Sequence, residues 1–157
     1  MSLHVEKRFD PRPYAIGVVV IHLALNIAHG VAHVQLAIVL DAFQKLFVGV
    51  VILAAPLFAG YLLWKRRLRT GGWLLAISMA GALAFGVYFH FILPGPDNVN
   101  QPDLTTPLRS RALFENTAVD LAITEALGVV LGLAVLIQSF APAGSATASN
   151  LGGRDSP

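Results

Sequence analysis

The sequence predicts an all-α membrane protein in which four transmembrane helices form an up-down bundle. The 157-residue chain is 55% hydrophobic and 13% charged, whereas charged residues make up about 25% of an average soluble protein. It also contains four apolar stretches, each as long as the roughly 20 helical residues that cross the hydrocarbon core of a bilayer. These stretches cover residues 14–38, 43–64, 72–93 and 112–140.

We expect one membrane domain over residues 14–140, between a cytoplasmic N-terminal tail (residues 1–13) and a disordered cytoplasmic C-terminal tail (residues 141–157). The last segment is rich in Gly, Ser and Ala, a composition typical of flexible segments. The first apolar stretch is too long and too polar for a cleaved signal peptide, whose apolar region has about 7–15 residues. The absence of cysteine excludes disulfides and thiolate metal ligands.

The orientation of the spans follows from the basic residues. Eight of the 11 fall on one side of the four spans: Lys7, Arg8, Arg12, Lys65, Arg66, Arg67, Arg69 and Arg154. Only Lys45, Arg109 and Arg111 fall on the other side. The positive-inside rule therefore places both termini in the cytoplasm and the protein in the cell (inner or plasma) membrane. Topology explains the basic residues without a nucleic-acid partner.

Local signals mark the ends of the predicted helices. The second helix begins with a capping box, Asp41-Ala-Phe-Gln44, and contains Pro56, which predicts a kink. Thr70 is the expected N-cap of the third helix. Thr106 and Pro107 provide an N-cap and a first-position proline for the fourth.

A stripe of polar residues follows the first helix within the sequence HLALNIAHGVAH, residues 22–33. Its polar members are His22, Asn26, His29 and His33. At about 100° per residue, all four fall within an arc of roughly 60°. Lipid cannot form hydrogen bonds with an imidazole, so this face must look into the bundle or into a watery cavity.

The depth of the polar residues in the bilayer sorts them into two layers. We count depth from the outer edge of each span at about 1.5 Å per residue. By this count one layer lies roughly 5–12 Å deep, and the innermost residues of the other layer lie about 20 Å deep. The outer layer contains His29, His33, His90 and Asp120, with Asp41 or Glu115 at its mouth. The deeper layer contains His22, Asn26, Thr124 and Glu125.

The outer layer predicts a transition-metal site. Imidazole and carboxylate ligands suit Zn²⁺, Cu²⁺ or Fe²⁺, and histidines one helical turn apart can bind the same ion. We expect His29, His33 and His90 to be ligands, and Asp120 either to bind the ion or to orient a ring. Asn26 is expected to interact with the ligating side chains without binding the ion itself. The ion would be structural, catalytic or in transit, so the sequence leaves enzymatic activity undecided.

Three alternatives stay open on the same residues. A b-type haem needs two imidazoles at matching depth, which His90 provides with either His29 or His33. A proton or ion path in a transport component would use the deeper layer, chiefly His22 and Glu125. A purely structural network would use both layers to hold the helices together.

The loop at 94–107 and the fourth helix suggest further contacts. The loop either folds over the outer layer, with Asp97, Asn98 or Asp103 pointing inward, or is an exposed connector. Gly128 and Gly132 lie one turn apart and favour close packing against a neighbouring helix or a second copy. The expected partners are thus the lipid bilayer and a homo-oligomer or membrane complex.

Overall fold

The computed structural model describes residues 9–100 and 107–141, and this part of the chain is helical without strands. In chain order the elements are α1 (Arg12–Gln35), α2 (Ala42–Phe47), η1 (Val48–Ala54), α3 (Ala55–Trp64), α4 (Leu68–Val87), η2 (Tyr88–Ile92) and α5 (Leu108–Phe140). Both η segments are π-helices, which continue the α-helices beside them. The elements therefore make four long helices.

These four helices match the apolar stretches in the sequence. They span 12–35, 42–64, 68–92 and 108–140, and each is long and apolar enough, by length and composition, to cross a membrane. The all-helical prediction with four long apolar helices is confirmed. The N-terminal residues 1–8, the segment 101–106 with Asp103 and Thr106, and the tail 142–157 lie outside the described residues.

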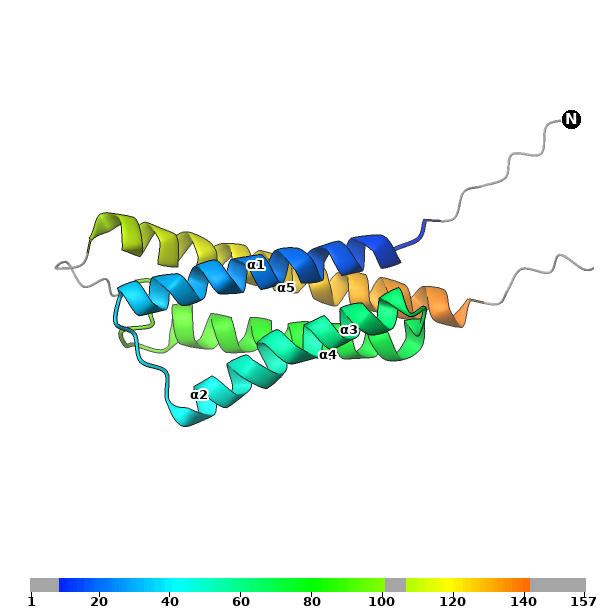
Figure 1. The fold of residues 1–157 in the computed structure, drawn as a ribbon, viewed down its shortest axis with the longest axis horizontal. Helices are drawn as coiled ribbons and strands as arrows, with labels where there is room; N and C mark the ends of the chain where they lie inside the picture. Colours follow the sequence, from blue (N-terminus) through cyan, green and yellow to red (C-terminus); the bar gives the residue numbers. More distant parts are fainter. Residues whose placement is uncertain (1–8, 101–106, 142–157) are drawn as a thin grey trace, which may run out of the picture.

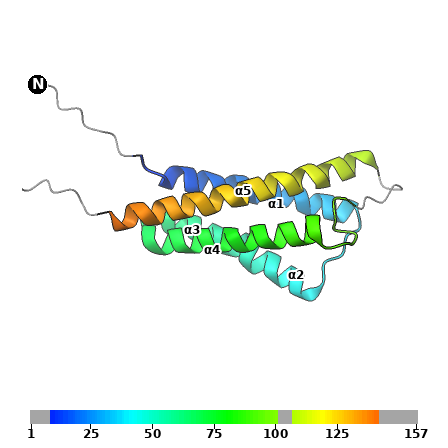
Figure 2. The ribbon, with the colours of Figure 1, turned by 180° about the vertical axis from the view of Figure 1, so that it is seen from behind.

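The helices lie side by side along one direction (Figures 1 and 2). Helix α5 packs against α1 and α4, and α3 packs against α1 and α4. Helix α2 splays away from the other helices, whereas α3 rejoins them (Figure 1). The beginning of α1 and the end of α5 lie at the same end of the molecule (Figure 1).

The apolar core lies between α1, α3, α4 and α5. Its buried members are Ala15, Val19, Ala59, Leu63, Leu75, Met79 and Val135. Small residues bring α4 and α5 together: a Cβ added at Gly132 would lie 2.8 Å from the Ala76 nitrogen, and one at Gly128 would lie 2.6 Å from Met79 Cγ. The two glycines therefore serve a neighbouring helix of the same chain.

The predicted helix ends are partly confirmed. The capping box is present, because Gln44 N donates to Asp41 Oδ1 and Asp41 N donates to Gln44 Oε1, both at 2.8 Å. The N-cap prediction for Thr70 is wrong, since α4 begins at Leu68. A tight turn explains the early start: Arg66 adopts a φ of 58°, and Arg67 N donates to Leu62 O at 2.8 Å.

The two π-helices place residues around one cavity. Segment η1 ends just before α3, where Pro56 lacks the N–H that an α-helix would need. Segment η2 carries His90 and ends before Pro94. Because π-turns are wider than α-turns, they rotate the residues that follow relative to a regular helix.

Candidate metal centre

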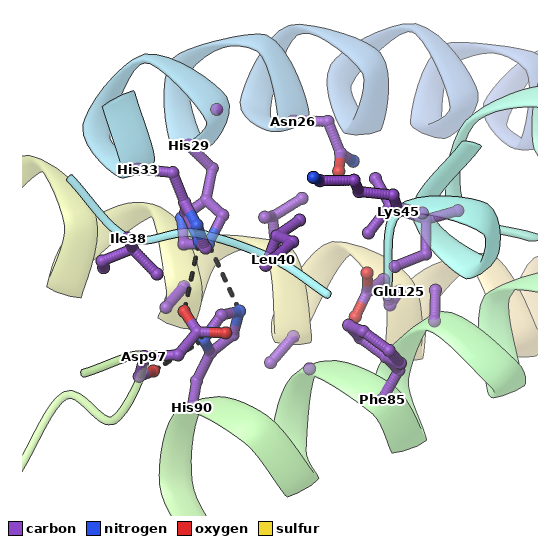
Figure 3. A pocket seen from close by; sticks show the side chains of 18 of the residues that line it. Asn26, His29, His33, Ile38, Leu40, Lys45, Phe85, His90, Asp97 and Glu125 are labelled. Carbon is purple, nitrogen blue, oxygen red and sulfur yellow. Dashed lines mark hydrogen bonds and ion pairs between the residues drawn. The ribbon is translucent and has the colours of Figure 1, made fainter. Parts of the chain in front are cut away.

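Three histidines converge between α1 and η2. His29 and His33 come from α1 and His90 comes from η2, and each offers a ring nitrogen within 4.8 Å of the others (Figure 3). His29 Nε2 lies 3.1 Å from His33 Nε2 and 3.3 Å from His90 Nε2. The structure thus brings together the three imidazoles that the sequence placed in the outer layer.

Phe114 of α5 packs against all three imidazole rings. It is stacked on His29 with a ring-centroid distance of 5.1 Å, and its ring lies 5.4 Å from those of His33 and His90. Phe114 is itself 4% exposed. It is an apolar wall that keeps the rings in place and water away, and nothing in its sequence context distinguished it from a core residue.

A threonine on α5 fixes the orientation of His29. His29 Nδ1 lies 2.8 Å from Thr117 Oγ1, and the Thr117 hydroxyl donates its one proton to Leu113 O at 2.6 Å. The hydroxyl must therefore accept a hydrogen bond from His29 Nδ1. This leaves the Nε2 lone pair of a neutral His29 directed at the other histidines.

The loop after η2 fixes the orientation of His90, as Thr117 fixes that of His29. His90 Nδ1 donates to the carbonyl oxygen of Asp97 at 3.0 Å. The loop is held against η2 because Val99 N donates to His90 O, and Asn98 Nδ2 donates to Leu93 O, both at 2.9 Å. His90 Nε2 is thus also an acceptor in the neutral ring.

These two assignments place two lone pairs opposite each other. His29 Nε2 and His90 Nε2 are 3.3 Å apart, with no hydrogen between them when both rings are neutral. A cation between them satisfies both lone pairs at once, whereas a neutral His33 that carries its proton on Nε2 satisfies only the lone pair of His29. This contact is the strongest chemical feature of the site.

Asp97 is the carboxylate next to the histidines. Its Oδ1 lies 3.2 Å from both His33 Nε2 and His90 Nδ1, and the residue is 9% exposed. Within the described part of the chain, neither carboxylate oxygen has a partner in hydrogen-bond geometry. Two buried oxygens are therefore available beside three imidazoles.

Asp120 does not join the histidines as the sequence suggested. It is exposed on α5 and lies outside the three-histidine group. The reason is helical geometry, since Asp120 lies about 140° around α5 from the buried Glu125. Of the two residues expected at the mouth, Asp41 caps α2 and Glu115 pairs with Arg111 at 3.8 Å.

The deeper layer forms a separate polar cluster. His22 Nε2 lies 3.3 Å from Glu125 Oε1 and 3.1 Å from Asn26 Nδ2, and both His22 and Glu125 are buried. Asn26 thus supports His22 rather than the three converging histidines. The Thr124 hydroxyl donates to Asp120 O at 2.7 Å, within α5, and makes no other hydrogen bond in the described residues.

A cavity of about 410 Å³ adjoins the site. The three histidines and Asp97 line one end of it, and Asn26, Lys45 and Glu125 line the other end (Figure 3). The sequence predicts only that Lys45 lies on the outer side of the membrane. Its place in the cavity depends on the splayed path of α2, which no local signal in the sequence predicts.

Comparison of the chain with protein-family models, curated proteins and solved structures gives no match. The function therefore has to be argued from the geometry of this chain alone. What the described residues contain is a buried group of three histidines that could hold a metal ion, within a protein of four apolar helices.

Proposed function

We propose that this protein is a small integral membrane protein in which His29, His33 and His90 bind one transition-metal ion, Zn²⁺, Cu²⁺ or Fe²⁺. The observation that carries the proposal is the contact between His29 Nε2 and His90 Nε2, where two acceptors face each other across 3.3 Å. A metal ion between them satisfies both lone pairs, and the nearby Nε2 of His33 supplies a third ligand.

The spacing of the nitrogens supports a tetrahedral ion. Two Zn–N bonds of about 2.05 Å at a tetrahedral angle separate their nitrogens by about 3.3 Å. The two Nε2 contacts of His29 measure 3.1 and 3.3 Å. Asp97 lies outside the three-histidine group, and its Oδ1 is next to His90 Nδ1, so it orients the rings and the fourth position is open to a water or a substrate.

The same geometry favours a bare ion over a b-type haem. Two axial histidines of a haem lie on opposite faces of the porphyrin, with their ligating nitrogens about 4 Å apart. His29 Nε2 and His90 Nε2 are closer than this, and His33 Nε2 contacts the same His29 nitrogen. A porphyrin between these rings would require them to move apart.

We place the protein in the cell membrane as an up-down bundle of residues 14–140, with both termini in the cytoplasm. Large apolar side chains on its outer surface support contact with lipid; Ile27, Ile77 and Val130 are each more than 60% exposed. The beginning of α1, with Arg12, and the connection from α3 to α4, with the basic residues of 65–69, lie at the end of the molecule where α5 ends (Figure 1). In this orientation the histidine site lies in the outer half of the bilayer.

The test is the metal content of the purified protein in mild detergent, measured together with its absorption spectrum. We expect one transition-metal ion per chain and no haem absorption. His90→Ala and His33→Ala should each lose the ion, whereas His4→Ala, outside the described residues, should keep it. Unchanged metal content in His90→Ala would show that the ligands are assigned wrongly, and a haem spectrum would replace the proposal with the haem alternative.

A further inference from the structure

The cavity beside the histidines extends well beyond the space that a metal ion needs. It measures about 410 Å³, within the range of about 300–1,000 Å³ that is usual for small-molecule sites. It lies beside α2, which splays away from the other helices (Figure 1). Residues of α1, of the connection at 36–41, of α2, η1, α4, η2 and α5, and Asp97 of the loop after η2 line it.

The middle of the cavity is apolar and its two ends are polar. Between the ends lie Ile38, Leu40, Val48, Ile52, Phe85 and Leu121. At one end are the histidines with Asp97, and at the other end Lys45 lies beside Asn26 and Glu125 (Figure 3). A ligand that fits this lining has an apolar body and a polar head.

Lys45 determines the charge of that head. It lines the cavity, and it forms no ion pair with any residue of 9–100 or 107–141, since Glu125 pairs with His22 instead. Lys45 is exposed at the edge of the cavity, where its ammonium group can pair with an anion whose apolar part lies inside. Asn26 Nδ2 is already directed at His22, so Lys45 is the main group for recognising an anion at this end.

The formal charges in the cavity also indicate that the ligand is an anion. This step rests on the proposed metal site: a divalent ion supplies two positive charges and buried Asp97 supplies one negative charge, whereas Glu125 is paired with His22 and Lys45 is exposed. One positive charge is left in a low-dielectric setting, where an unbalanced charge is costly. A ligand with a single negative charge balances it.

We infer that the cavity binds a monocarboxylic acid with an apolar chain, whose carboxylate pairs with Lys45 and whose chain lies along the apolar middle section towards the histidines. Such a molecule dissolves in the bilayer and reaches the cavity where α2 diverges from α1. The metal ion strengthens its binding through the charge balance. Metal-free protein therefore binds the acid more weakly.

Two glycines of α1 provide a matched pair of variants. Gly30 lines the cavity, and a Cβ added there meets nothing within 4 Å, so Gly30→Leu adds side-chain volume to the lining without a close contact at its Cβ. A Cβ at Gly17 also meets nothing within 4 Å, and Gly17 is outside the cavity. Lys45→Met removes the charge and keeps most of the length of the side chain.

The experiment measures radiolabelled decanoate retained by zinc-loaded protein in phosphatidylcholine nanodiscs, relative to empty nanodiscs, with decanol as the uncharged comparison. We expect saturable binding of decanoate at one site per chain and at least a tenfold loss of affinity in Gly30→Leu and in Lys45→Met. Gly17→Leu should bind like the wild type, and decanol should bind about tenfold more weakly than decanoate.

Zinc content is measured on each sample, which separates the two proposals. Decanoate retained no better than by empty nanodiscs, or equally by Lys45→Met and wild type, overturns the inference even when one zinc per chain is bound. Binding of decanol as tight as that of decanoate overturns it as well. Saturable, Lys45-dependent binding of decanoate by a protein that takes up no zinc supports the cavity and overturns the metal site.

Discussion

Thr117 shows how much a single hydroxyl contributes to the candidate metal site. Because it donates to Leu113 O, it accepts from His29 Nδ1 and directs the His29 Nε2 lone pair at His90. A partner of this kind holds both the tautomer and the orientation of a metal-binding imidazole. Thr117 lies two helical turns before Thr124, so its place on the buried face of α5 follows from the sequence. Its contact with His29 does not follow from the sequence.

Replacing Thr117 should therefore weaken metal binding without unfolding the protein. We expect Thr117→Val to lower the affinity for zinc by about 10–100-fold, the usual effect of losing a hydrogen-bond partner of a ligand. The measurement is a competition titration of zinc against a chelator. Thr124→Val is the matched control, because its hydroxyl bonds only to Asp120 O in its own helix. Equal affinities in the two variants would contradict the role of Thr117.

The carboxylate of the site marks the limit of residue-level prediction. The sequence placed Asp120 at the right depth, but depth along a helix does not specify the face on which a side chain lies. The sequence offers Asp97 only as one of three loop residues that could point inward, and its position depends on the hydrogen bonds of Val99 to His90 O and of Asn98 to Leu93 O. Such a loop conformation results from tertiary contacts that the sequence does not display locally.

The helices themselves were predictable because their signals are local. Apolar length predicts the four long helices, a capping box predicts the start of α2, and spaced glycines predict close packing of α5 against a neighbouring helix or a second copy, which in the structure is α4. The π-helical segments η1 and η2 were not predicted, since a periodicity of 3.6 residues assumes a regular helix. They matter because η2 carries His90, and η1 contributes Val48 and Ile52 to the cavity.

The site combines features that local sequence signals predict with features that depend on tertiary contacts. The polar stripe on α1 and the histidine near the end of the third long helix lie close to the same predicted membrane boundary. These two patterns predict that His29, His33 and His90 come together. Helix α2, which contributes Lys45 to the cavity, diverges after the connection at 36–41, where Ala37 adopts a positive φ of 53° (Figure 1). A non-glycine residue in that conformation is uncommon, and the sequence gives no sign of it.

The whole molecule is proposed to span the membrane with both ends in the cytoplasm, and the lack of cysteine makes this orientation directly measurable. A single cysteine is introduced at Asn100, after η2, or at Ala141, after α5, both of which are exposed. We expect a membrane-impermeant maleimide to label Asn100→Cys in intact cells and Ala141→Cys only after lysis. Labelling of Ala141→Cys in intact cells would contradict the proposed orientation.

The metal site is tested most directly by X-ray absorption spectroscopy of the zinc-loaded protein, which counts the ligands around the ion and identifies imidazoles by their ring scattering. Three histidine nitrogens at about 2.0–2.1 Å, with one further light ligand, are the predicted result. The same spectrum of His90→Ala should show fewer imidazoles or no bound zinc. A wild-type spectrum without imidazole scattering, or with a single histidine, would show that the three converging rings do not hold the ion.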